Sequence, residues 1–197
     1  MPPSREQLVH LTENPVAFLN SEDVTLRRIA ITALTREQAD ANFDSLSAHV
    51  AESSAAVRAA TAEKLGYCDD RPMDALEVLG NDTDPTVREA VATAYGELAR
   101  PQAVPWLMEA SLDDDDRHVK EAAVAALGAI GDPAAIDTLL KTLEGGPPQV
   151  RRRAIAAITV FDDERIEPAI QRAALDRNPG VREAAEMVVG KQITPSE

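Results

Sequence analysis

The chain has 197 residues, of which 44% are hydrophobic and only 3% aromatic, and its formal net charge is −14. Such a composition supports a buried core and excludes a disordered chain, while the acidic balance provides no basic footprint for a nucleic-acid partner. Cys68 is the only cysteine, which excludes an intrachain disulfide, and no span approaches the roughly 18 apolar residues of a membrane helix, so we expect a soluble cytoplasmic protein without a membrane partner.

The first predicted helix begins after Ser4, which forms a capping-box pattern with Gln7, and the same pattern recurs at Thr35 and Gln38. Each first helix is followed by a breaker and an alanine-rich second helix. The second helices begin with an apolar residue followed by a basic one: Leu26-Arg27, Val57-Arg58, Val87-Arg88, Val119-Lys120, Val150-Arg151 and Val181-Arg182. Successive pairs are 31, 30, 32, 31 and 31 residues apart, a period typical of helical repeats.

Counted from the apolar residue of each pair as position 1, positions 1, 5, 8 and 9 are mostly apolar and form one helical face. Turn residues such as Asn178-Pro179-Gly180 close the hairpins, and Asp132 before Pro133 supplies a helix start. A single hairpin cannot bury its apolar face, so the copies must stack. The pattern therefore predicts an all-α solenoid of six antiparallel helix hairpins. It forms one domain over 1–197, with repeats near 4–34, 35–66, 70–98, 100–130, 132–160 and 163–190 and a tail at 191–197.

The run from Asp115 to Ile136, DDRHVKEAAVAALGAIGDPAAI, resembles the HEAT-like repeat of the phycobilin lyases. The resemblance covers the whole chain, most closely in repeats three to six. It implies an armadillo-like helical superhelix, a fold that serves scaffolds, chaperones and a few enzymes. In the proteins that the chain resembles, an acidic or polar residue six places before each basic one forms a ladder between repeats; here these are Ser21, Glu52, Asp82, Asp114 and Asp176. Repeat five has Gly145 at that place, which leaves Arg151 free for another role.

Candidate catalytic and metal-binding residues form no recognisable motif. His10, His49 and His118 occupy unmatched positions, whereas the architecturally similar di-iron deoxyhypusine hydroxylase relies on several His-Glu pairs, which are lacking here. Two aspartates follow Cys68 and raise its pKa rather than lower it. We therefore expect a non-enzymatic scaffold with no catalytic residue, cofactor or metal. The alternative is a chaperone-like or lyase-type subunit of the bilin lyase kind, acting on a partner protein. A HEAT-like DNA glycosylase is disfavoured by the acidic charge.

In a solenoid of this kind the second helices line the concave face, and their exposed positions recur across repeats. Position 6 carries Val124 and Ile155 in repeats four and five, either as an exposed apolar stripe or as a contact with the neighbouring repeat. Repeat five also has the only run of three arginines, and arginine beside aliphatic residues is a common interface composition. The residues that we expect to bind a protein partner are Glu121, Val124, Arg151, Arg152, Arg153 and Ile155.

Two further surfaces come from single features. Trp106 lies outside the apolar face of its helix and is either a binding hot spot or partly buried against the next repeat. The last helix carries Met187, Val188, Val189 and Ile193 with little sequence after them. Because a terminal repeat normally has a polar outer face, this end is expected either to form a homodimer through the C-terminal repeat or to fray.

Overall fold

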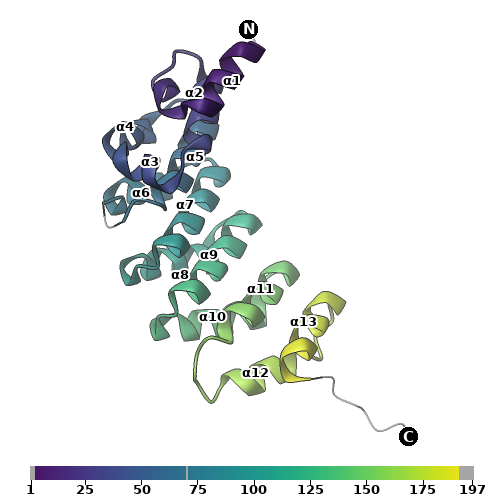
Figure 1. Cartoon of the computed structure of the whole chain (residues 1–197). Helices are drawn as coiled ribbons and strands as arrows, with labels where there is room; N and C mark the ends of the chain where they lie inside the picture. Colours follow the sequence, from purple (N-terminus) through teal and green to yellow (C-terminus); the bar gives the residue numbers. More distant parts are fainter. Residues whose placement is uncertain (1–2, 70, 191–197) are drawn as a thin grey trace, which may run out of the picture. The chain divides into compact units, whose positions relative to one another are not determined.

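A computed structural model of the chain describes residues 3–69 and 71–190, and every regular element in those ranges is helical (Figure 1). The helices form two compact units, residues 1–98 and 99–197, and the division falls between the third and fourth predicted repeats. Each unit contains three stacked helix hairpins. The predicted all-α solenoid of hairpin repeats is therefore confirmed over the described residues.

The first unit contains seven α-helices and two short 3-10 helices within its described residues. They are α1 (Arg5–Glu13), η1 (Pro15–Phe18), α2 (Val24–Ala33), α3 (Arg36–Ala41), α4 (Phe43–Ser47), η2 (Ala48–Ala51), α5 (Ala55–Leu65), α6 (Met73–Gly80) and α7 (Pro85–Leu98). The second helices of the hairpins, α2, α5 and α7, pack in that order, and the first helices cover them.

The second unit repeats the arrangement more regularly over residues 99–190. It contains η3 (Pro101–Ala103), α8 (Val104–Asp113), α9 (Arg117–Ile130), η4 (Pro133–Ala135), α10 (Ile136–Gly145), α11 (Pro148–Ile158), α12 (Ile166–Ala173) and α13 (Pro179–Val189). The second helices α9, α11 and α13 form one layer, and the first helices α8, α10 and α12 form the other (Figure 1). Each hairpin therefore contacts its neighbours through both layers.

The first segment of repeat two departs from the single helix that we predicted for each half-hairpin. Asn42 has φ −113° and ψ 27° and ends α3, and its side-chain Nδ2 donates to the Gln38 carbonyl at 2.8 Å. An asparagine side chain that bonds the nearby backbone competes with continuation of the helix. The segment therefore continues as α4 and η2, and the described residues contain thirteen α-helices rather than about twelve.

The predicted helix starts are confirmed. Ser4 and Thr35 each form a complete capping box with the glutamine three residues later. Asp116 accepts from the backbone N–H groups of His118 and Val119 at the start of α9. These contacts satisfy backbone donors that have no partner inside the helix.

Small residues bring the second helices close together. Positions 1 and 5 of all six repeats are buried. Gly128 of α9 lies so near α11 that a Cβ there would be 2.8 Å from both the Cα and the Cβ of Ala157, and Gly66 makes the same approach to Ala94. The helices thus pack through alanine and glycine, which agrees with the low content of aromatic residues.

Candidate partner-binding surface

The arginine at position 2 of a second helix reaches toward the following repeat. Arg58 donates from Nε and Nη2 to the Asp82 carboxylate at 2.6 and 2.9 Å. Arg151 contacts Asp176 in the same way, at 2.9 and 2.6 Å. In each pair the acid lies 24 or 25 residues after the arginine, so the bond joins one hairpin to the next.

The same guanidinium groups also hold the start of their own helix. Arg58 donates from Nη1 to the Glu52 carbonyl at 2.7 Å, and Arg182 to the Asp176 carbonyl at 2.8 Å. The expected pairing of each arginine with the side chain six residues earlier is therefore wrong, because that residue contributes its backbone carbonyl. The donated bonds hold the pKa values of Asp82 and Asp176 below the usual range, although burial opposes the shift.

The expectation that Arg151 is free is also wrong. Its side chain is 5% exposed and is bonded to Asp176 and to the Gly146 carbonyl, the latter at 2.6 Å. Because each acid serves the preceding repeat, a missing acid in repeat five affects Lys120 of repeat four instead. Lys120 donates from Nζ to the Leu112 carbonyl at 2.7 Å and has no carboxylate partner among the described residues.

Val124 and Ile155 are buried, at 0% and 1% exposure, which corrects the interpretation of position 6 as an exposed stripe. In repeat four, Val124 at position 6 is four residues after the ladder residue Lys120 and four before Gly128, so these three residues lie on the helix stripe that faces the next repeat. Ile31, Ala62 and Ala92 are buried at the same position of the first unit. This burial agrees with the alternative interpretation, contact with the neighbouring repeat.

The remaining candidates differ in how accessible they are. Glu121 is half-buried and forms an ion pair with Arg117, Nε to Oε1 3.3 Å, along α9. Trp106 is half-buried on α8 and has contacts of its own. Arg152 and Arg153 are exposed, and the side chain of neither forms a hydrogen bond or ion pair with another described residue.

Residues of α9, α11 and α13 that are exposed, or half-buried in the case of Ala125, form a surface that the sequence only partly predicts. Position 7 carries Ala125, Ala156 and Met187, one residue from each helix, and Met187 is 77% exposed. We call the following residues the second-helix face: Ala125, Arg152, Arg153, Ala156, Glu183 and Met187. Position 7 could have been found from its spacing, because it lies four residues after the charged position 3.

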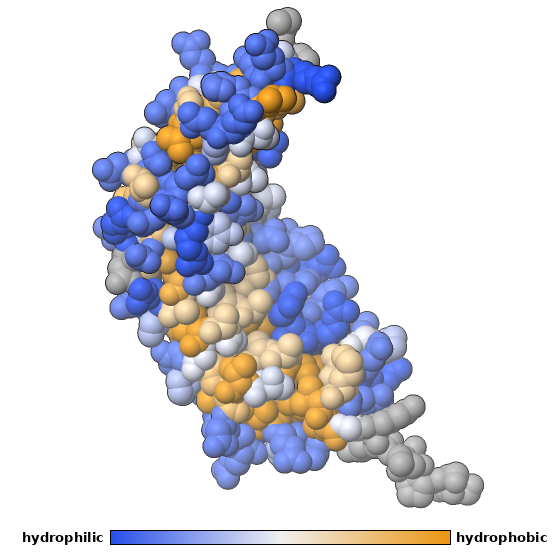
Figure 2. Space-filling model, viewed as in Figure 1, coloured by the Kyte–Doolittle hydropathy of each residue, from blue (hydrophilic) through white to orange (hydrophobic). Residues whose placement is uncertain are grey.

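The C-terminal repeat carries both polar and apolar exposed residues. Met187 and Val188 are exposed, as is Leu175 before α13, and apolar surface gathers over the C-terminal helices in Figure 2. The positions that face a following repeat elsewhere are occupied by Arg182 and Glu186, which are polar. The apolar end that the sequence suggested is therefore mixed in character, and its Ile193 lies outside the described residues.

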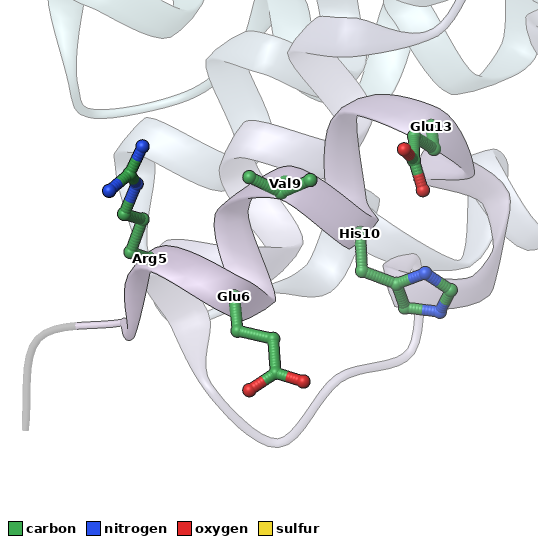
Figure 3. Close-up of a pocket in the computed structure, with 5 residues that line it drawn as sticks. All are labelled: Arg5, Glu6, Val9, His10 and Glu13. Carbon is green, nitrogen blue, oxygen red and sulfur yellow. The ribbon is translucent and has the colours of Figure 1, made fainter.

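Two pockets lie away from this face. One lies along a single side of α1, lined by Arg5, Glu6, Val9, His10 and Glu13 (Figure 3). A second lies between α10 and α12 and is lined by Leu140, Glu144, Glu164, Arg165, Pro168 and Arg172. In that groove Arg172 pairs with Glu144 at 3.3 Å, so two of its charged groups already have a partner.

The titratable residues lie apart from one another. His49 is buried with Nδ1 3.7 Å from Glu52 Oε1, whereas His10 lies against Phe18 and His118 beside Asp116. Within residues 3–69 and 71–190, no three His, Cys, Asp or Glu side chains form a group that could hold a metal. Burial, followed by the Asp40 charge, raises the pKa of Cys68 to about 11, so its thiol is protonated at neutral pH.

A family model described as HEAT repeats matches residues 72–146 and 136–197, which together span more than half of the chain. The chain is a HEAT-repeat protein. No curated protein matches its sequence.

The HEAT-repeat chain is also similar to several solved structures. One is the complex of CpcE and CpcF of phycocyanin lyase from Nostoc, with 25% identity and a TM-score of 0.64, covering 88% of this chain and 74% of that one. Another is the Escherichia coli protein YibA, with 20% identity and a TM-score of 0.67, covering 94% and 74%. A designed armadillo repeat protein in complex with a (KR)4 peptide has 17% identity and a TM-score of 0.60, covering 89% and 96%.

The predicted HEAT-like repeat of the phycobilin lyase type is thus confirmed. Within the HEAT repeats, the ladder arginines and the buried position 6 hold the stack together. Positions 3 and 7 remain at the surface, together with Arg153 at position 4. None of the helices among the described residues is long and apolar enough to cross a membrane.

Proposed function

We propose that the chain is a non-catalytic adaptor that binds a protein partner on the second-helix face of its second unit. The observation that carries the proposal is that Arg152, Arg153 and Met187 are exposed and their side chains form no hydrogen bond or ion pair with another described residue, unlike Arg151 beside them. Exposed arginine and methionine next to small apolar residues match the composition of protein interfaces. The single buried cysteine is compatible with a cytoplasmic protein.

Two similar solved structures support a role in binding a protein or a peptide. The CpcE chain is in complex with CpcF, and the designed armadillo repeat protein is in complex with a peptide. Repeat proteins of this construction present extended surfaces on which partners lie. Glu121 remains a candidate at the edge of the same face, where its pairing with Arg117 lowers the contribution expected from it.

The test is affinity capture from the source cells with the full chain as bait. We expect a partner that is retained by the wild type and lost by Arg152→Glu/Met187→Glu. The matched control is Arg5→Glu/Val78→Glu, because Arg5 and Val78 are also exposed but lie in the first unit. A partner captured equally by wild type and both variants would contradict the assignment to this face. If the folded wild-type protein captured no partner, this result would contradict the adaptor role.

The second candidate is a chaperone-like or lyase-type subunit, and the likeness to the phycocyanin lyase complex favours it. A protein of this kind would carry or transfer a chromophore. The absorption spectrum of the purified chain, before and after incubation with a bilin, distinguishes the two: a visible band that survives gel filtration supports the lyase-type role and argues against a simple adaptor.

Self-association through the C-terminal repeat is a separate proposal. Leu175 and Val188 are exposed there, while Arg182 and Glu186 occupy the stacking positions. Light scattering decides it, because a homodimer that dissociates in Leu175→Glu/Val188→Glu supports the proposal, and a monomer at all concentrations contradicts it.

A further inference from the structure

The second-helix face is cationic at its centre although the chain as a whole is acidic. Arg152 and Arg153 are adjacent, exposed and without a carboxylate partner among the described residues. Some other exposed arginines of the second unit are paired, Arg165 with Asp137 at 2.7 Å and Arg172 with Glu144 at 3.3 Å, whereas Arg177 is exposed without a carboxylate partner among the described residues. Two adjacent guanidinium groups left unpaired in a chain of net charge −14 are positioned to receive acidic groups from outside.

The sequence of repeat five makes this pair a local exception. Position 4 is Ile29, Ala60, Ala90, Ala122 and Ala184 in the other repeats, so only repeat five has a charged residue there, Arg153. Stacking does not require that charge, because Ala60 and Ala90 are buried at the same position, at 6% exposure each. Repeat five therefore has Arg153 at a position where alanines are packed in other repeats, and this arginine adds a second positive charge beside Arg152.

The apolar part of the face lies one helical turn further on. Ala156 is four residues after Arg152, and Met187 occupies the same position 7 in the next second helix. Val160, four residues beyond Ala156, is 61% exposed. The face thus offers guanidinium groups on one side and small or flexible apolar side chains on the other, and methionine adapts readily to the shape of a partner.

We propose that the occupant of the second-helix face is an acidic amphipathic segment of the partner protein. Its carboxylates pair with Arg152 and Arg153, and its apolar side chains lie over Ala156 and Met187. Arginine is suited to this role because its planar guanidinium binds a carboxylate through two parallel bonds. This inference rests on the proposed adaptor function and specifies the chemistry of the partner at the same face.

The proposal is tested with two labelled peptides and the full chain, at physiological salt. The probes are a synthetic peptide of alternating glutamate and leucine and its counterpart of alternating lysine and leucine, with binding followed by fluorescence anisotropy. The wild type is expected to prefer the acidic peptide even though its net charge of −14 repels it. Arg152→Glu/Arg153→Glu should weaken binding of that peptide by about tenfold or more, since two charge pairs are lost and two repulsions added.

The matched control is Arg5→Glu/Lys141→Glu, which changes the net charge by the same amount at two exposed residues outside the face. It should retain the preference for the acidic peptide, and circular dichroism should show both variants folded. Equal weakening by both variants would overturn the proposal, because the effect would then come from the total charge. Preference of the wild type for the lysine peptide would overturn it as well.

A single-stranded oligonucleotide of mixed sequence is a third probe, because unpaired arginines also bind phosphate. Binding of the oligonucleotide that is lost in Arg152→Glu/Arg153→Glu would overturn the assignment to an acidic protein segment. Failure of this inference can be told apart from failure of the adaptor function. A captured partner that depends on Met187 but not on Arg152 and Arg153 would preserve the adaptor and contradict only the acidic occupant.

Discussion

Arg151 and Asp176 are joined by two hydrogen bonds, from Nη2 to Oδ1 at 2.6 Å and from Nε to Oδ2 at 2.9 Å. The arginine is on α11 and the aspartate precedes α13, so the pair connects repeats five and six. Arg151 also donates to the Gly146 carbonyl at 2.6 Å. A single buried guanidinium thus holds the start of its own helix and the next hairpin together.

Asp176→Asn should lower the free energy of unfolding by about 2 kcal/mol, because it leaves the buried Arg151 charge without a carboxylate. Urea unfolding followed by circular dichroism measures the change. Glu144→Gln is the control, since it breaks the exposed pair with Arg172 and should cost less than about 0.5 kcal/mol. Equal losses in the two variants would show that burial of the ladder pair has no special effect.

Lowering the pH should destabilise the folded stack, because it protonates the ladder aspartates. The bonds from Arg58 and Arg151 hold the pKa values of Asp82 and Asp176 below the usual range. A carboxylate with a lowered pKa in the folded state stabilises the protein above the pKa of the unfolded chain, about 4, and this contribution is lost as the pH falls through the folded value. The melting temperature should therefore change little between about pH 7 and 5 and fall steeply below about pH 4. Asp82→Asn/Asp176→Asn should flatten that fall, and an unchanged pH profile would contradict the assignment.

Gly128→Ala should destabilise the second unit by about 1 to 3 kcal/mol, because the added Cβ meets Ala157 of α11 at 2.8 Å. Gly145→Ala is a close control within the same unit, since nothing lies within 4 Å of its Cβ position. Chemical unfolding of the two variants compares them directly. A Gly128→Ala protein as stable as the wild type would show that α9 and α11 can separate without cost.

Gly146→Asp should fail to restore the missing ladder acid. The Gly146 carbonyl accepts from Arg151, so Gly146, rather than Gly145, occupies the ladder place. A Cβ there would lie 2.7 Å from the Thr142 carbonyl oxygen. We expect a loss of about 1 to 3 kcal/mol in both the wild type and Lys120→Arg. Stabilisation in the Lys120→Arg background, detected by a double-mutant cycle, would contradict this expectation.

The sequence was sufficient to predict the hairpins but not the partners of the ladder. With a period of about 31 residues, an acid six places before one arginine also lies about 25 places after the previous arginine. Periodicity alone therefore permits both pairings, and only the direction in which the guanidinium points selects Asp82 for Arg58. The prediction that Arg151 is free is wrong because it assumes that each arginine pairs with the residue six places before it.

The candidate site was predicted in part for a related reason. Within each unit, the second helices pack against their hairpin partners and against the second helices of adjacent repeats, so only a narrow stripe stays exposed. Hydrophobicity does not identify that stripe, because Ala156 is exposed whereas Ile155 beside it is buried. The charges of Arg152 and Arg153 identify them as candidates, whereas the sequence places Met187 at the end of the stack rather than on the second-helix face.

Hydrogen–deuterium exchange of the full chain, alone and with the captured partner, tests the central claim most directly. If the partner binds the second-helix face, amides at the exposed ends of α11 and α13 and in the turns that flank them should gain protection. The first helices α10 and α12 should exchange as before. Protection confined to α8, α10 and α12, or to the first unit, would contradict the assignment of the second-helix face as the binding surface.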